Sequence, residues 1–380
     1  MKAVVCQDGE LSVTTVTQPQ PGPGQLLVKV VRAGICGSDL HARTHAAELA
    51  EIASESGYPG VMAAGSSVVF GHELVGEVVA YGPQTRGTWK PGTLVTALPV
   101  RRDADGTHLV GFEEGAPGAY AEYTVVQEAF TFEVPEGLEP DLAAFTEPLA
   151  VAWHAVRRAK VGKRPVIVIG CGPIGLAIIL MLRAAGAKKI IASDFSPARR
   201  RLAEQCGATT VVDPREESPW DVYRPTGPIS SPAAYAEYGI KAVGAARRVP
   251  FLPWEKALLH AELLGQAPQG PVVFECVGIP GMIEQIVTAA PIMTRLVVVG
   301  VCMEPDSFRP AAAINKEIEI RFAFGYDPAE FNQTLGMIAS GKVDPSPLHT
   351  GTVGLEGVSK AFTDLGNPEV HAKILIDPSL

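Results

Sequence analysis

The sequence lacks paired cysteines, an excess of basic charge and an apolar N-terminal stretch, and each absence excludes a class of protein. Its six cysteines are scattered, which argues against a disulfide framework. The formal net charge of −9 argues against nucleic acid or anionic lipid as a partner, because phosphates are bound by basic surfaces. The first ten residues do not resemble a secretion signal. We therefore expect a cytoplasmic protein that binds neither membranes nor nucleic acid.

An uninterrupted apolar run long enough to cross a membrane is also missing. Residues 166–182 are almost wholly apolar, but Gly170, Gly172, Pro173 and Gly175 interrupt them. Such a segment is typical of a buried strand, a tight turn and the start of a buried helix. We therefore predict no membrane span in this segment.

The first 150 residues contain short β-branched runs separated by glycine and proline. With 47% hydrophobic and 19% charged residues in a chain of 380, we expect a globular protein of two or three domains. In the first part, strands are predicted over residues 25–31, 74–79, 94–98 and 120–126. Their spacing favours an irregular, largely antiparallel barrel or sandwich.

The pattern changes near Pro165, where short apolar strands begin to alternate with helices. This alternation indicates βαβ units and a parallel sheet. The predicted strands cover residues 166–169, 189–194, 210–212, 272–276, 296–300 and 319–324, and the helices 174–185 and 198–205.

The segment between positions 213 and 271 is too long for a simple connection between a helix and a strand. It contains two tryptophans and many prolines, so we predict an ordered insertion with a helix over 254–264. After it, a helix over 329–340 and a final strand over 372–376 are expected.

A glycine pattern, Gly170-Cys171-Gly172-Pro173-Ile174-Gly175, follows an apolar strand and opens a helix. In that context the first glycine makes the turn, the second admits a pyrophosphate to the backbone, and the third lets the helix pack on the strand. The N-terminus of the helix supplies free N–H groups to the phosphates. The pattern predicts a dinucleotide site.

Asp194 lies at the end of the second strand of this region, where a ribose-binding acid belongs. A carboxylate there accepts hydrogen bonds from ribose hydroxyls and repels a 2′-phosphate, which favours NAD over NADP. Arg199, Arg200 and Arg201 follow closely, so NADP remains an alternative. Asp194 could also be an ordinary turn residue.

Cys36, the run Gly71-His72-Glu73 and Glu147 together offer a thiolate, an imidazole and carboxylates. These are the ligand types of a catalytic zinc. Taken singly, Cys36 would be a buried small residue and His72 a core histidine. Glu73 and Glu147 both remain candidates for the third ligand, and the other would hold the bound water or lie behind the metal.

Ser38 and His41 follow the cysteine closely and suggest a proton relay. An alcohol must lose its hydroxyl proton before a hydride leaves its carbon, and a hydroxyl followed by a histidine could carry that proton away. The alternative is that Ser38 is a turn residue and His41 is simply exposed.

Together these residues resemble the zinc-containing medium-chain alcohol and polyol dehydrogenases. The similar segments are residues 34–41, 71–76, 147–150, 170–175, 274–278 and 297–300. The resemblance implies a GroES-like β-rich catalytic domain (1–151 and 326–380) and a Rossmann domain, a doubly wound parallel sheet that binds NAD (152–325). The insertion at about 214–270 is not covered by the resemblance.

The resemblance also implies an active site in the interdomain cleft, with Ser38 and His41 as the relay. The further cofactor contacts expected on this basis are Arg199, Val277, Val299 and Lys373. Edge-strand pairing through 319–324 would give a homodimer or homotetramer. Residues 98–121 contain no cysteine, so we expect one catalytic zinc, no structural zinc, and a position near the sorbitol-dehydrogenase-like branch.

The leading hypothesis is a zinc-dependent oxidoreductase that transfers a hydride between a secondary alcohol or polyol and NAD. One alternative keeps the fold and loses the metal: an NADPH-dependent quinone or enone reductase. Another is a non-catalytic binding protein, since a fold alone does not fix function. The sequence identifies neither the substrate nor the direction of the reaction.

Overall fold

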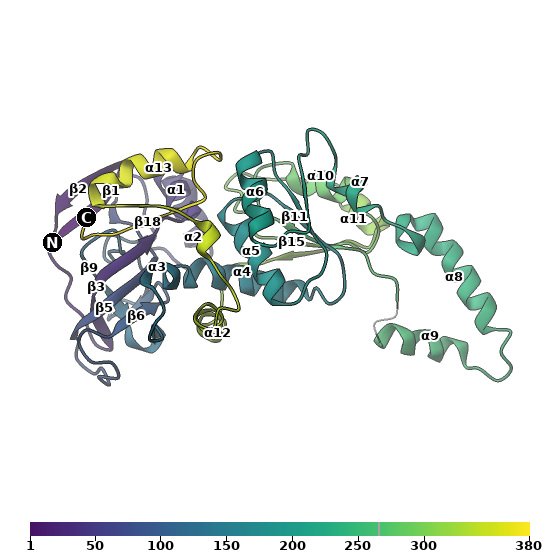
Figure 1. Cartoon of the computed structure of the whole chain (residues 1–380), viewed down its shortest axis with the longest axis horizontal. Coiled ribbons are helices and arrows are strands. Elements are labelled where there is room, and N and C mark those ends of the chain that lie inside the picture. The colour runs from purple at the N-terminus through teal and green to yellow at the C-terminus, as the bar shows by residue number, and fades with distance from the viewer. Residues whose placement is uncertain (265–266) are drawn as a thin grey trace.

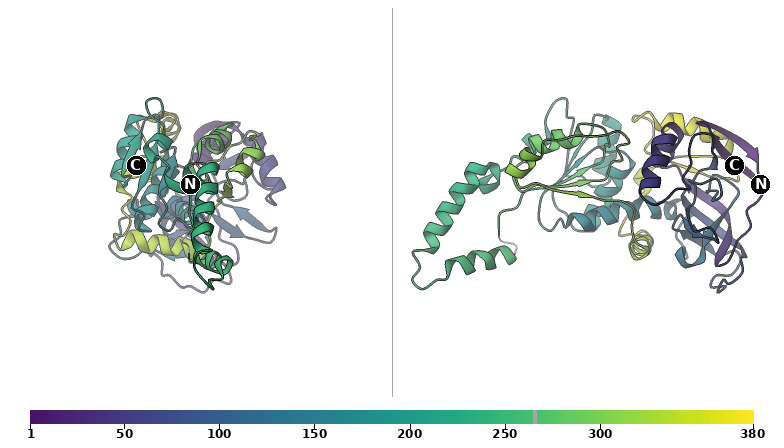
Figure 2. Two further views of the ribbon diagram at one scale, coloured as in Figure 1. Left: turned by 90° about the vertical axis from the view of Figure 1, so that its right-hand side faces the viewer. Right: turned by 180° about the vertical axis from the view of Figure 1, so that it is seen from behind.

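The computed structural model describes residues 1–264 and 267–380, which form two lobes and a helical arm (Figure 1). The first lobe holds both chain termini, and the arm extends from the far end of the second lobe (Figures 1 and 2). Among the described residues, no helix is both long enough and apolar enough to cross a membrane.

The first lobe is built on a seven-stranded sheet whose order is β10-β6-β5-β3-β18-β17, with β9 also paired to β3. A three-stranded sheet, β2-β1-β4, and a hairpin, β7-β8, complete its strands. The strands are β1 (Lys2–Gln7), β2 (Glu10–Thr15), β3 (Gln25–Gly34), β4 (Ser67–Val69), β5 (Glu73–Tyr81), β6 (Leu94–Ala97), β7 (Val100–Arg102), β8 (Thr107–Leu109), β9 (Tyr123–Gln127), β10 (Thr131–Glu133), β17 (His349–Val353) and β18 (Lys373–Ile376).

The strand-rich, largely antiparallel first part is confirmed, and the C-terminal strand β18 joins it by pairing antiparallel with β3. This part also contains two helices that were not expected, α1 (Gly37–Thr44) and α2 (Ala46–Glu55). Helix α1 begins directly after Cys36 because the Asp39 carboxylate accepts a hydrogen bond from the Cys36 backbone N–H, as in a capping box. Ser38 and His41 therefore lie on a helix rather than in a turn.

The second lobe contains a six-stranded, wholly parallel sheet in the order β13-β12-β11-β14-β15-β16. This order confirms the doubly wound Rossmann architecture. Strands are added from β11 to β13 on one side and from β14 to β16 on the other, and such sheets bind ligands at this switch point between β11 and β14. Its strands are β11 (Val166–Ile169), β12 (Ile190–Ser193), β13 (Thr210–Val212), β14 (Val272–Glu275), β15 (Arg295–Val298) and β16 (Glu319–Phe322). The accompanying helices are α5 (Pro173–Ala184), α6 (Pro197–Gln205), α7 (Pro219–Tyr223), α10 (Met282–Ala289) and α11 (Pro310–Asn315).

Two helices, α4 (Thr146–Ala159) and α12 (Pro328–Ala339), join the lobes. The buried Glu330 carboxylate on α12 accepts from Arg157 Nη1 at 2.9 Å and lies 2.8 Å from His154 Nδ1, both on α4. One apolar cluster continues across this joint, from Val75 and Leu375 through to Phe274 in the parallel sheet. The short helices α3 (Pro140–Ala143) and α13 (Val358–Leu365) cover the first lobe.

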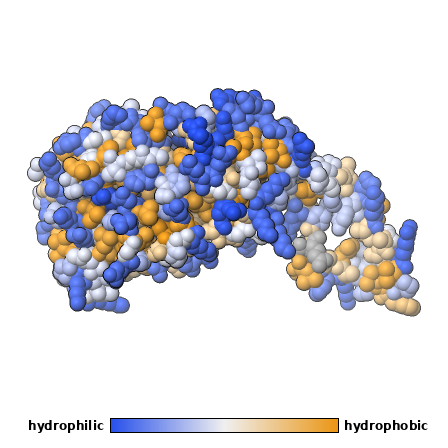
Figure 3. Space-filling view, viewed as in Figure 1, coloured by the Kyte–Doolittle hydropathy of each residue, from blue (hydrophilic) through white to orange (hydrophobic). Residues whose placement is uncertain are grey.

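The arm consists of α8 (Pro232–Ala246) and α9 (Trp254–Leu263), inserted between β13 and β14. The sequence predicted a helix over 254–264, in agreement with α9, but did not predict α8. Helix α8 has no buried residue, and apolar side chains such as Ile240 and Phe251 are exposed. Hydrophobic residues are visible on the surface of the arm (Figure 3). Isolated helices of this length are only marginally stable in water, because helices in proteins are stabilised mainly by packing. Helix α8 lacks this packing.

Candidate metal and cofactor site

Three potential metal ligands converge where β3, β5 and the start of α1 meet. The Cys36 Sγ, a ring nitrogen of His72 and a carboxylate oxygen of Glu73 all lie within 4.8 Å of one another. Gly34 at the end of β3 pairs with Glu73, and a Cβ on Gly34 would lie 1.8 Å from Glu73 Oε2. A glycine is therefore required at position 34 for the carboxylate to occupy its place.

The surroundings of Glu73 fit a divalent cation. Its Oε1 accepts a hydrogen bond from the Nζ of Lys373, and both side chains are buried. Its Oε2 is buried without a hydrogen-bond partner, which is costly for a carboxylate oxygen unless a cation satisfies it. A thiolate, an imidazole and a carboxylate are a donor set suited to zinc, so these residues fit a zinc ion.

Asp39 is a site residue that was not predicted from the sequence. Its side chain is fully buried, and its Oδ2 accepts from the Tyr120 hydroxyl at 2.6 Å and from the Cys36 backbone N–H at 3.0 Å. Its Oδ1 lies 3.3 Å from His72 Nδ1. A carboxylate behind a histidine fixes the orientation and tautomer of a metal-binding imidazole. The available signal was an acidic residue three positions after Cys36, which can cap a helix.

The charge state of His72 depends on its neighbours. Burial alone lowers the pKa of His72, but Asp39 and Cys36 outweigh burial and hold this pKa well above its usual value. These two neighbours therefore favour the protonated imidazole when no cation is present. Because a metal requires the neutral imidazole, a proton and a metal ion compete for this side chain.

Glu147 lies in the first turn of α4, close to this cluster but outside the group of three converging ligands. Its Oε1 accepts a hydrogen bond from the Tyr326 hydroxyl at 2.9 Å. Burial raises the pKa of Glu147 to about 7, although His72 opposes this change. Tyr326 was not predicted, because 179 residues separate it from Glu147 and nothing in the sequence relates them.

Ser38 and His41 lie one turn apart on α1. The Ser38 hydroxyl is 3.3 Å from His72 Nε2, so the structure brings this serine to the cluster. Burial, reinforced by the adjacent His45, lowers the pKa of His41, so its imidazole is neutral at pH 7. In the described part of the chain, no direct hydrogen bond joins Ser38 to His41.

The glycine turn lies between β11 and α5. Gly170 has a positive φ of +88°, and Gly172 is the N-cap of α5, which begins with Pro173 and Ile174. A Cβ on Gly175 would lie 2.0 Å from the Gly170 carbonyl oxygen, so the helix could not approach the turn so closely with a side chain there. The turn and helix N-terminus have the form that cradles a pyrophosphate.

Asp194 directly follows β12 and faces this turn. Its Oδ2 accepts from the Cys171 backbone N–H and its Oδ1 from the Ser196 N–H, each at 2.7 Å. The Arg199 guanidinium lies 3.9 Å from where a Cβ on Gly172 would be. An acid and a cation therefore both border the turn.

Of the other expected cofactor residues, Val277 and Val299 lie in the second lobe and Lys373 lies at the metal ligands. Val277 and Val299 follow the carboxyl ends of β14 and β15, and Val277 Cγ2 would lie 2.8 Å from a Cβ on Gly170. Lys373 was expected near the cofactor phosphates, but its Nζ forms the buried pair with Glu73 instead. The reason is that β18 pairs with the end of β3, which brings Lys373 to the metal ligands.

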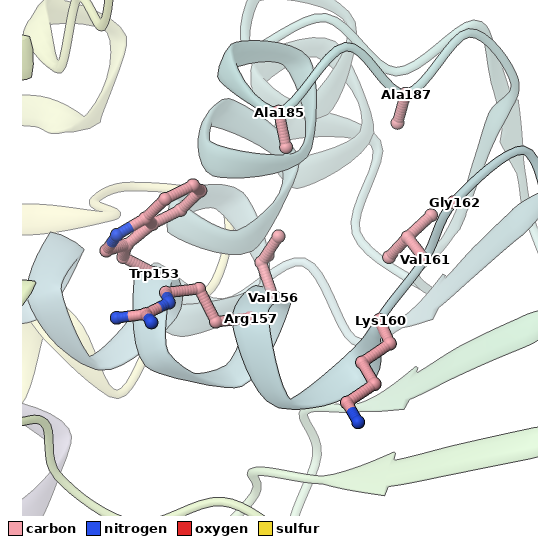
Figure 4. Close-up of a pocket in the computed structure, with 8 residues that line it drawn as sticks. All are labelled: Trp153, Val156, Arg157, Lys160, Val161, Gly162, Ala185 and Ala187. Atoms are coloured by element: carbon pink, nitrogen blue, oxygen red, sulfur yellow. The ribbon is translucent and has the colours of Figure 1, made fainter.

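A hollow of about 410 Å³ lies beside the C-terminal half of α4 (Figure 4). Glu147 lies at the other end of this helix. The hollow is lined by Trp153, Val156, Arg157, Lys160 and neighbouring residues. None of the site residues predicted from the sequence lines this hollow, so the hollow is separate from the candidate site.

Two family models match the chain. The first, described as "Alcohol dehydrogenase GroES-like domain", matches residues 22–136 and contains Cys36, His72 and Glu73. The second, described as "Zinc-binding dehydrogenase", matches residues 173–225, which begin at the glycine turn and contain Asp194. The first model therefore covers the three converging metal ligands, and the second covers the start of α5 and Asp194.

The chain is similar to known proteins along its whole length. (R,R)-Butanediol dehydrogenase of Bacillus subtilis (strain 168) is 28% identical over an alignment of 381 positions that covers 97% of each chain. Sorbitol dehydrogenase of Bos taurus is 28% identical over 95% of this chain and 92% of the relative. The solved structure of a Sinorhizobium meliloti 1021 protein bound to NADP is 27% identical, has a TM-score of 0.74 and covers 99% of both chains. The two family models and these relatives support the resemblance of the chain to the zinc-containing medium-chain alcohol and polyol dehydrogenases, a family of oxidoreductases.

Proposed function

We propose that the protein is a zinc-dependent dehydrogenase that transfers a hydride between a secondary alcohol or polyol and NAD. The observation that carries this proposal is the convergence of Cys36, His72 and Glu73 around a buried, unpartnered carboxylate oxygen. Relatives named for their action on butanediol and sorbitol support the substrate class.

Cys36, His72 and Glu73 would hold one zinc ion in this site, and no structural zinc is expected. Bound there, zinc supplies a Lewis acid that polarises the oxygen of an alcohol or carbonyl. Asp39 holds His72 in orientation from behind, and Lys373 balances the charge of Glu73. Glu147, which accepts a hydrogen bond from Tyr326, would hold the bound water or lie behind the metal.

Ser38 and His41 would carry the hydroxyl proton of the substrate toward solvent. The Ser38 hydroxyl lies beside His72, where it can accept that proton. His41 is one helical turn further on and half-buried, and its neutral imidazole can accept the proton next, through an intervening water.

NAD would bind with its pyrophosphate at the glycine turn and accept the hydride. Asp194 would hold the adenosine ribose hydroxyls, and Val277 and Val299 would line the cleft beside β14 and β15. Arg199 could instead neutralise a 2′-phosphate, so it is the residue through which NADP would be accepted.

We further infer that the chain forms a homodimer or homotetramer. The edge strand β16 leaves Phe322 exposed, and the arm exposes Ile240, Phe251 and Leu259. These exposed apolar side chains are the residues that such an interface would cover.

The metal assignment predicts that purified protein contains one zinc per chain by elemental analysis. Cys36→Ser should lose that zinc and lower NAD-linked alcohol oxidation more than about 100-fold, since even supporting residues of metal sites contribute 10- to 100-fold. Cys302→Ser, at a partly exposed cysteine in the other lobe, is the matched control. A zinc-free wild type that reduces quinones or enones with NADPH would sink the assignment.

The relay predicts a pH dependence for alcohol oxidation. Below its pKa, His41 is protonated and cannot accept a proton, and burial places that pKa below 6.5. The kcat/KM should therefore fall on the acid side, below pH 6.5. His41→Gln should lower kcat/KM about 100-fold and remove this acid limb. If the pH dependence of kcat/KM for His41→Gln has the magnitude and the shape of the wild-type curve, the relay is ruled out.

The cofactor assignment predicts that NAD is used in preference to NADP. Asp194→Ala should raise the KM for NAD about tenfold, equivalent to about 1.4 kcal/mol, because hydrogen bonds to ribose are lost. Glu204→Ala, at an exposed position on α6, is the control. Steady-state kinetics with both cofactors provide the measurement, and a preference for NADP that Arg199→Ala abolishes would contradict the assignment.

The arm offers a test of the assembly. Phe251→Ser removes a fully exposed aromatic ring from the arm and should shift the protein to a smaller species in light scattering after gel filtration. Lys241→Ser changes another exposed arm residue without removing apolar surface and should leave the mass unchanged. An arm without a role in assembly would give the wild-type mass for both variants.

A further inference from the structure

A cluster of four charged residues lies in the β7-β8 hairpin and the loop that follows it. The imidazole of His108 lies between two carboxylates, with Nε2 2.8 Å from Asp103 and Nδ1 2.7 Å from Glu113. Arg101, opposite His108 in the hairpin, also lies near Asp103. Hydrogen bonding to Glu113 raises the pKa of His108, so both ring nitrogens can donate and the two positive charges balance the two negative ones.

Glu113 fixes the loop that leaves the hairpin. Its Oε1 accepts from the Leu109 backbone N–H at 2.7 Å, while its Oε2 contacts His108. A Cβ on Gly60 would lie 2.5 Å from this carboxylate, so the neighbouring loop closes tightly over it. The same two loops are joined by a hydrogen bond from the Met62 N–H to the Phe112 carbonyl at 2.8 Å.

The residue delivered by this loop is Phe112, which contacts the candidate metal site. Its ring centroid lies 4.9 Å from that of His72, with 34° between the ring planes. The two ring nitrogens of His72 lie against Asp39 and Ser38, each at 3.3 Å. An apolar ring at this distance keeps water from one side of the imidazole and limits its rotation.

We propose that His108 is a positioning residue, which bridges Asp103 and Glu113 so that Phe112 stays seated on His72 and closes that side of the metal site. The proposal deepens the proposed function and rests on it for the identity of the metal. The ion pairs of His108 with Asp103 and Glu113 would order the loop that carries Phe112, which contains no cysteine. The ion pairs act through Phe112, not on the substrate.

A double-mutant cycle on zinc-stripped protein tests this directly. The readout is the rate at which iodoacetamide alkylates Cys36, followed by mass spectrometry with Cys302 as the internal standard. His108→Ala and Phe112→Ala should each raise the Cys36 rate about tenfold relative to Cys302, and the double variant should not exceed Phe112→Ala, because residues that act as a unit are not additive. An unchanged Cys36 rate in His108→Ala, or additive effects, would overturn the proposal.

A gentler pair of substitutions separates positioning from general loss of structure. Asp103→Asn weakens one of the two ion pairs, whereas Asp105→Asn removes the same charge from an exposed position two residues away. Only Asp103→Asn should raise Cys36 alkylation. If His108→Ala makes both cysteines more reactive, the fold has been disturbed. The comparison of Asp103→Asn with Asp105→Asn then tests the proposal.

Kinetics of the zinc-loaded enzyme provide the second readout. His108→Ala should raise the KM for alcohol about tenfold and leave the KM for NAD unchanged, because the glycine turn is in the other lobe. A protein that holds no zinc and oxidises no alcohol would refute the proposed function. The alkylation result would still stand, because it requires neither metal nor substrate.

Discussion

The site depends on how β3 pairs with its neighbours around Gly34. On one side Gly34 is opposite Glu73 of β5, and on the other it is opposite Leu375 of β18. This register brings together a cysteine just after β3, a histidine and a glutamate at the start of β5, and a lysine at the start of β18. Because Gly34 has no side chain, the Glu73 carboxylate fits against the strand. A shift in this register would separate the ligands.

Much of the second lobe could be predicted from the sequence, because its signals are local. The strand expected over 210–212 coincides with β13, and the glycine pattern lies in the predicted turn between β11 and α5. Apolar runs of four residues separated by helices leave few alternatives to a parallel sheet. The ligand types at Cys36, His72 and Glu73 were also recognisable, since each is chemically competent without knowledge of the fold.

The remaining features depend on contacts between distant segments. Tyr326 reaches Glu147 because it closely precedes α12, which packs against α4. Lys373 reaches Glu73 because β18 returns to the first lobe. The sequence left Glu73 and Glu147 as equal candidates, whereas the geometry groups only Glu73 with Cys36 and His72. Helix α8 escaped prediction because it has no buried face, and so its sequence lacks the apolar periodicity that marks most helices.

The pairing of Glu73 with Lys373 also bears on the order in which the chain becomes ordered during synthesis. The two residues are 300 positions apart, so a ribosome makes Lys373 only after the whole parallel-sheet lobe. Until then, the Glu73 carboxylate of the emerging first lobe lacks the lysine that offsets its burial, which opposes compaction around it. Synthesis of the first lobe therefore begins before that of the second lobe and ends after it, although N-terminal domains usually fold first on the ribosome.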